Sequence, residues 1–172
     1  MNQTRTNWKA IVGFNTIEET KASEIVSTLP KDPRIVYTFI KDEQGGNGYA
    51  GKVRNSIIQL CDTKWLCFLD DDDTFTSDYF DRFAEELGKK PDSDAIIFRM
   101  TRKEYSPIPS YGMDDIVINY VGISFAVRRK FLIDNGIKFN NSKTEDFEYL
   151  NDIKIRGGKI VISKYITYHI RF

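Results

Sequence analysis

The feature that most constrains this chain is a regular alternation of short apolar segments with amphipathic ones over residues 10–100. Strands are expected at 10–16, 34–42, 65–69 and 94–100, and helices between them at 17–30, 49–60 and 77–88. The segment 65–69 (WLCFL) is continuously apolar, which is typical of a strand covered on both faces. Because parallel strands are joined by helical crossovers, the alternation predicts an α/β fold, a three-layer α/β/α sandwich around a mainly parallel central sheet.

The second part of the chain is less regular. An irregular loop is expected at 103–115, followed by a strand at 116–127, a short helix at 128–136, a helix at 144–158 and a final strand at 159–172. Gly88, Gly136 and Gly157 are expected to stop three of the helices. No repeat, low-complexity tract or linker divides the 172 residues, so a single domain is expected.

Charge and composition argue against several kinds of partner. The 25 basic and 25 acidic residues give a net charge of +0, so no overall field directs the chain to nucleic acid or to a membrane surface. No apolar run is long enough for a membrane span, and the N-terminus lacks the apolar core of a signal peptide. Cys61 and Cys67 lie in apolar surroundings and are expected to be free buried thiols, which suits a cytoplasmic protein.

Four consecutive aspartates, Asp70 to Asp73, follow the predicted strand at 65–69. Ligands of open α/β folds bind beyond the carboxyl ends of the strands. Two carboxylates about 4 Å apart repel by roughly 1 kcal/mol in water and roughly 4 kcal/mol at an effective dielectric near 20. Mg²⁺ or Mn²⁺ would supply the missing counter-charge, since these ions prefer carboxylate oxygen and keep positions for water and substrate phosphates. The pattern therefore indicates half of a metal–diphosphate site.

Other interpretations of the acidic stretch differ in what they require. A solvated loop that caps the next helix needs only Asp73 or Asp78. An EF-hand loop counted from Asp70 would need glycine and glutamate where Phe75 and Asp81 stand, which excludes it. A haloacid-dehalogenase phosphatase would use Asp70 as its nucleophile in the pattern D-x-D-x-T. That alternative stays open, although the pattern follows the third predicted strand and not the first.

Three motifs carry a resemblance to a known family. Residues 48–80 (GYAGKVRNSIIQLCDTKWLCFLDDDDTFTSDYF) hold a basic R-N helix segment, then an apolar strand that ends in D-x-D, then a helix. Residues 121–139 (VGISFAVRRKFLIDNGIKF) resemble an acceptor-side strand and helix, and 144–150 (TEDFEYL) resemble an E-D motif. In this order, the motifs resemble those of inverting, family-two-type glycosyltransferases of the GT-A fold.

The resemblance extends from about Ala10 to Arg171 and implies a Rossmann-like GT-A domain. Its nucleotide-sugar half would be at about 8–100 and its acceptor half at about 101–172. The compact size is similar to that of glycosyltransferase domains encoded by large algal viruses, which would place the protein in the host cytoplasm. A sugar would move from a nucleotide-diphosphate sugar to a hydroxyl of a glycan or another acceptor. The family resemblance favours a UDP-sugar as the donor.

The resemblance also implies roles for the acidic residues. Mn²⁺ or Mg²⁺ would be the cofactor and Asp72 its ligand, while Asp70 and Asp71 would contact the ribose or a metal-bound water. Asp146 of the E-D motif would be the general base that takes a proton from the acceptor hydroxyl. The alternative for this motif is a pair of carboxylates favoured by a helix N-terminus, which suits Glu145 better than Asp146.

The nucleotide pocket is expected where the first two strands end, beside the glycine-rich loop. Asn15 and Thr16 lie at the end of the first strand, and Asp42 lies at the end of the second. Lys52 and Arg54 would bring positive charge near the base or phosphates, Arg54 at the family's arginine position. A plain turn for the loop glycines and a solvated helix face for Lys52 remain open.

His169 is the single histidine of the chain and is expected on one face of the final strand with Tyr165 and Thr167. Several GT-A enzymes use a histidine near the C-terminus as a further metal ligand, and an ordinary hydrogen-bonded histidine is the alternative here. Because the chain is short for a GT-A enzyme, a non-catalytic module that binds nucleotide sugars or carbohydrate is a further possibility.

Overall fold

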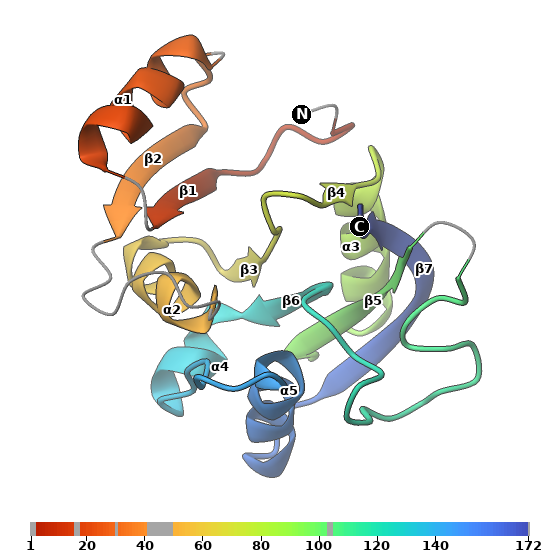
Figure 1. Cartoon of the computed structure of the whole chain (residues 1–172). Coiled ribbons are helices and arrows are strands. Elements are labelled where there is room, and N and C mark those ends of the chain that lie inside the picture. The colour runs from red at the N-terminus through yellow and green to blue at the C-terminus, as the bar shows by residue number, and fades with distance from the viewer. Residues whose placement is uncertain (1–2, 16–17, 30, 41–49, 103–104, 172) are drawn as a thin grey trace.

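The computed structural model describes residues 3–15, 18–29, 31–40, 50–102 and 105–171 (Figure 1). The elements in chain order are β1 (Ala10–Asn15), α1 (Glu19–Thr28), β2 (Ile35–Ile40), α2 (Ala50–Leu60), β3 (Trp65–Cys67), β4 (Thr74–Phe75), α3 (Tyr79–Lys89), β5 (Ala95–Thr101), β6 (Phe125–Arg128), α4 (Arg129–Asp134), α5 (Glu145–Ile155) and β7 (Ile160–His169). The alternation of strands and helices expected over the first part of the chain is therefore confirmed.

The strands form a mixed sheet, which corrects the expectation of a mainly parallel one. In the five-stranded sheet the order is β3-β6-β5-β7-β4, and only β5 and β7 pair in parallel among these neighbours. The strands β1 and β2 pair in parallel as a separate two-stranded unit. The difference arises because β6 lies between β3 and β5 and runs antiparallel to both.

The second half differs most from its sequence-based prediction. The strand expected at 116–127 is reduced to β6, because the preceding segment turns at Asn119, whose φ of 66° lies in the left-handed region. Ile116 and Ile123 of that segment are nevertheless buried in the core. The strand expected at 65–69 ends at Cys67, and the two-residue strand β4 was not expected.

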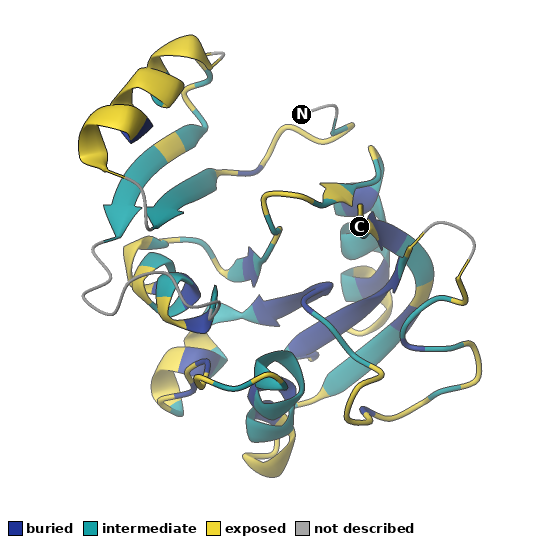
Figure 2. Ribbon diagram, viewed as in Figure 1, coloured by how far each residue is buried: buried dark blue, intermediate teal, exposed yellow. Residues whose placement is uncertain are grey.

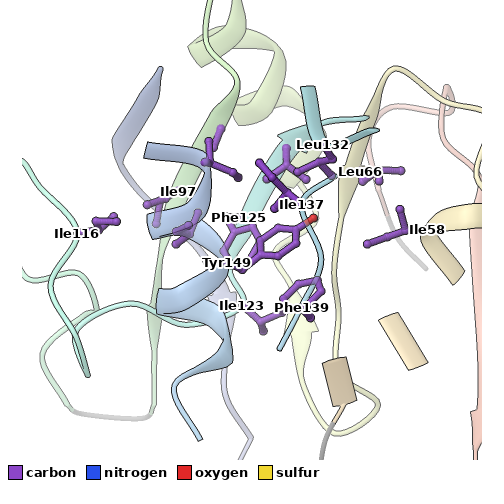
Figure 3. Close-up of a cluster of buried hydrophobic side chains, with 14 of the residues drawn as sticks. Ile58, Leu66, Ile97, Ile116, Ile123, Phe125, Leu132, Ile137, Phe139 and Tyr149 are labelled. Atoms are coloured by element: carbon purple, nitrogen blue, oxygen red, sulfur yellow. The ribbon is translucent and has the colours of Figure 1, made fainter. Parts of the chain in front are cut away.

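Helices cover both faces of the five-stranded sheet, as expected for three layers (Figure 1). Along β5, Ile97 joins a core cluster with Ile58 of α2, Leu132 of α4 and the inward face of α5, whereas Ile96 joins the cluster against α3. Figure 2 shows that the buried residues concentrate along β5 and β6. In Figure 3 the aromatic rings of the first cluster lie together, and those of Phe139 and Tyr149 stack with centroids 3.9 Å apart.

Two of the three glycines expected to stop a helix do so. Gly136 and Gly157 follow α4 and α5 with φ of 62° and 81°, as expected for helix stops. Helix α3 instead continues through Gly88 to Lys89, and its N-cap is Asp78. None of the helices in the described part of the chain has the length and apolar character needed to cross a bilayer.

The two cysteines are free thiols, as expected, but both residues are partly and not fully buried. Burial raises the pKa of Cys67 to about 11, so this thiol is not a reactive thiolate at neutral pH.

The packing of α5 gives a first prediction. Leu150 is fully buried in the core cluster, so Leu150→Ala is expected to lower the free energy of unfolding by about 2–5 kcal/mol. Ile155 of the same helix is 68% exposed, so Ile155→Ala is expected to change it by less than about 0.5 kcal/mol. Urea unfolding of both variants would measure this, and equal losses would contradict the assignment of the inward face.

Candidate active site

The four aspartates form a tight turn between two strands. The backbone N–H of Asp73 donates to the carbonyl oxygen of Asp70 at 3.2 Å, so residues 70–73 are a β-turn. The turn follows β3 closely and leads directly into β4. Asp71 and Asp72 at its centre are exposed, whereas Asp70 is half-buried. The turn therefore has two exposed aspartates at its centre, between the partly buried Asp70 and Asp73.

The end of β7 lies beside this acidic turn. His169 is the ladder partner of Thr74, two residues after Asp72. The backbone N–H of Arg171 donates to Oδ1 of Asp73 at 3.0 Å, and the backbone N–H of Asp70 donates to the hydroxyl oxygen of Tyr168 at 3.3 Å. The final strand and Arg171 just after it thus hold both ends of the turn, and the strand places the backbone of His169 beside Thr74.

Arg54 connects the turn to the first turn of α5. Its guanidinium is buried, with 9% of the residue exposed, and its Nη2 donates to Oδ1 of Asp70 at 2.6 Å. Its Nη1 donates to Oε1 of Glu145 at 2.7 Å and reaches Oδ1 of Asp146 at 3.5 Å. The predicted base Asp146 and the first aspartate of the predicted D-x-D motif are therefore brought together around one cation.

The neighbour of Arg54 holds the same helix in place. The side chain of Asn55 donates from Nδ2 to the carbonyl oxygen of Phe139 and accepts at Oδ1 from the N–H of Phe139, both at 2.9 Å. Gly51, one turn earlier, donates its N–H to Oε2 of Glu145 at 3.1 Å, and a Cβ at Gly51 would lie 2.6 Å from that oxygen. The two residues of the R-N segment therefore make different contacts. Asn55 binds α2 to the loop before α5, and Arg54 binds α2 to the acidic residues.

Among the carboxyl groups of this cluster, Asp146 has a pKa raised close to neutral pH. Burial raises the pKa of Asp146 to about 7; the charge of Arg54 opposes this rise, and the nearby carboxylates Glu145 and Asp70 add to it. Burial also raises the pKa of Glu145. Although burial alone would lower the pKa of Arg54, the three carboxylates raise it. A carboxyl group that titrates near neutral pH is suited to accept a proton during a reaction.

The residues expected around a nucleotide are only partly described. Asn15 ends β1 opposite Ile40 of β2, and its Oδ1 is buried without a hydrogen-bond partner among the described atoms. Such an oxygen at a strand end is a candidate ligand contact. Thr16, Asp42 and the glycine-rich loop lie outside the described residues.

Lys52 does not share the environment of Arg54. It is exposed and two residues away on α2, a spacing at which helical side chains do not face each other. It lines a surface hollow of about 640 Å³ with Ile40 and with residues of and after α4, among them Leu132 and Lys138. The structure therefore separates the two basic residues that the sequence placed together.

The donor groups present fit a divalent ion that is shared with a substrate. No three His, Cys, Asp or Glu side chains within the described residues are arranged to hold a metal by themselves. Mg²⁺ and Mn²⁺ need no such cage, because one or two carboxylates suffice when phosphates and water fill the other positions. The exposed residues Asp71 and Asp72 match that pattern.

Two contributors to this site were not expected from sequence. Glu145 was interpreted as a charge at the start of its own helix, but its carboxylate reaches α2. The opposite charges of the R-N and E-D motifs are the one sequence feature that could have indicated this contact. Tyr168, which supports the turn at Asp70, gave no such signal, because a buried tyrosine in a strand is ordinarily a core residue.

The layered α/β architecture, with an acidic turn after β3 and a second acidic motif at the start of α5, defines a domain of the GT-A type. The chain belongs to glycosyl transferase family 2, since the sequence model of that family matches residues 2–144. The family and fold expected from the motifs are thereby confirmed. No curated protein matches the chain.

Solved structures share this fold. S. aureus TarS superposes with a TM-score of 0.73 and 16% identity, covering 99% of this chain and 32% of TarS. S. aureus TarS 1–349 in complex with UDP gives 0.69 and 16%, covering 98% of this chain and 53% of the other. The bifunctional IspDF from Campylobacter jejuni gives 0.50 and 14%, covering 90% and 37%. The chain therefore spans between 32% and 53% of the length of these proteins.

The raised pKa of Asp146 predicts a pH dependence of stability. Between the ordinary aspartate value of 3.8 and about 7, the folded protein keeps a proton on Asp146 that the unfolded chain has released. The contribution of Asp146 to the free energy of unfolding therefore falls as the pH rises through this window. Asp146→Asn lacks this equilibrium, so wild type is expected to lose stability relative to the variant between about pH 4 and pH 7, and no further above about pH 8. Urea unfolding across this range would measure the difference, and a flat difference would mean an ordinary carboxyl group.

Proposed function

We propose that this chain transfers a sugar from a nucleotide-diphosphate sugar to an acceptor hydroxyl, with Asp146 as the general base and with inversion at the anomeric carbon. The observation that carries the proposal is the meeting of Asp70 and Asp146 on Arg54, because it joins the donor-side acidic turn to a carboxyl group that titrates near neutral pH. Membership of glycosyl transferase family 2 supports the same reaction class.

The reaction requires one proton transfer and one displacement. Asp146 accepts the proton of the acceptor hydroxyl, whose oxygen forms a bond to the anomeric carbon as the bond from that carbon to the diphosphate oxygen breaks. The nucleoside diphosphate leaves with the electron pair of the broken bond. Attack from the face opposite the leaving group inverts the configuration.

The turn would hold the diphosphate through Mn²⁺ or Mg²⁺. Asp72 would be the protein ligand, with His169 as a candidate second ligand, and the bound ion would neutralise the charge that develops on the departing diphosphate. Asp70 and Asp71 would contact the ribose or a metal-bound water. The exposure of Asp71 and Asp72 supports this arrangement, because a diphosphate can approach them from solvent.

The nucleotide would lie where β1 and β2 end. The unpaired buried Oδ1 of Asn15 supports a contact there, with Thr16, Asp42 and Lys52 as further candidates. Uridine is the favoured base because the similar TarS fold has been solved with UDP bound. The haloacid-dehalogenase alternative gains no support, since the D-x-D pattern lies at the third strand of a family 2 glycosyltransferase domain.

A single substitution tests the metal ligand. Asp72→Asn keeps the size of the side chain but removes its charge, and it is expected to lower the Mn²⁺-dependent turnover of a UDP-sugar by about 100-fold or more. The assay would screen a panel of UDP-sugars for transfer to added glycans and for slow hydrolysis. Asp134→Asn, at an exposed ion pair on α4, is the matched control and is expected to retain wild-type turnover. Full activity of Asp72→Asn would exclude Asp72 as the metal ligand.

A further inference from the structure

The hydrogen bonds of Arg54 are unequally shared among three carboxylates. Asp70 and Glu145 take the short ones, at 2.6 and 2.7 Å, while Asp146 is 3.5 Å away. Glu145 is also the most enclosed of the three, with 13% of its side chain exposed against 24% for Asp146. The guanidinium is therefore largely committed to the two carboxylates that are not the proposed base.

Glu145 is fixed from two sides. Its Oε1 accepts from Arg54, and its Oε2 accepts the N–H of Gly51 in the first turn of α2. A carboxylate beside a helix N-terminus is favoured by the helix dipole. Both oxygens are thus used, and the start of α5 is held at a set distance from the start of α2.

How Arg54 is shared among the carboxylates affects how well Asp146 can act as a base. An aspartate paired closely with an arginine becomes a weaker proton acceptor, because the cation stabilises its charged form. If Glu145 did not occupy Nη1, the guanidinium would be free to pair with the adjacent Asp146 at short distance. Asp146 would then keep its charge at neutral pH but hold a proton poorly.

We propose that Glu145 is a positioning residue that engages Arg54 and Gly51, and so holds the pairing of Arg54 with Asp146 at the long distance of 3.5 Å, which leaves Asp146 able to accept a proton. The proposal rests on the proposed function, because it assigns Glu145 a role toward the base of that reaction. Charged groups face Asp146 from three places, which are Arg54 on α2, Asp70 on the acidic turn and Glu145 on its own helix. On a fourth side the groups nearby are uncharged, since a Cβ at Gly122 would lie 4.0 Å from Oδ2 of Asp146 and 2.6 Å from Sδ of Met100.

The test uses Glu145→Gln and a matched control in the same helical turn. Glutamine keeps the shape and one acceptor oxygen but removes the charge that holds Arg54. Glu148→Gln makes the same change at a residue whose partners are Ser142, Thr144 and Asn140, away from Arg54. Both variants would first be checked for folding by circular dichroism.

Two readouts are expected to move in Glu145→Gln and not in Glu148→Gln. The kcat for a UDP-sugar is expected to fall about 10-fold or more while KM stays within about 2-fold, since an acceptor-side base and not donor binding is affected. The pKa of Asp146, followed by carbon-13 NMR of its carboxyl group, is expected to fall by about one unit or more, because the repelling charge of Glu145 is removed and Arg54 turns to Asp146. The acidic limb of the pH–rate profile should move to lower pH with it.

The outcomes separate the two proposals. If wild type is active and Glu145→Gln matches Glu148→Gln in kcat and in the Asp146 titration, the positioning role is overturned and the proposed function stands. If wild type turns over no nucleotide-diphosphate sugar of a panel that includes the UDP-sugars, the proposed function fails whatever the titration shows. Should Glu145→Gln not fold, Glu145→Asp replaces it; its shorter carboxylate cannot span Arg54 and Gly51 together, and unchanged kcat would overturn the role.

Discussion

The interaction on which the site depends is the buried guanidinium of Arg54 among three carboxylates. Asp70 comes from the acidic turn, and Glu145 and Asp146 come from the start of α5, so one side chain joins parts of the chain that are far apart in sequence. A buried cation without partners would be costly, and so would three clustered carboxylates without a cation. Removing one partner from a buried ion pair typically costs about 3–5 kcal/mol, so these groups stabilise one arrangement of α2, the turn and α5 together.

The surrounding fold supplies the geometry for this contact. Asn55 ties α2 to the backbone of Phe139, whose ring stacks on Tyr149 of α5, and Gly51 allows the first turn of α2 to approach Glu145. On the other side, β7 supports the acidic turn through Tyr168. These contacts bring the turn after β3 and the start of α5 together around Arg54.

Much of this was predictable from local sequence, and the rest depended on contacts between distant segments. Helix α5 was recognisable from its apolar spacing and its glycine stop, and the acidic turn from four aspartates after an apolar strand. The mixed sheet was not, because the direction of β6 depends on the path of the chain before it, and β4 is defined by pairing with β7 alone. The bond from Arg54 to Glu145 depends on how closely two helices approach, which neither motif reveals by itself. The roles of Asp72 and His169 toward a metal, and of Asp146 as a base, stay predictions.

The central claim is that the acidic turn and the E-D motif form the two halves of one transferase site. Anomalous X-ray scattering from crystals soaked with Mn²⁺ and UDP tests it most directly. The account predicts a manganese peak between the carboxylate of Asp72 and the diphosphate, with Arg54 still bridging Asp70 and Glu145. UDP bound elsewhere, or no manganese at the turn, would contradict it.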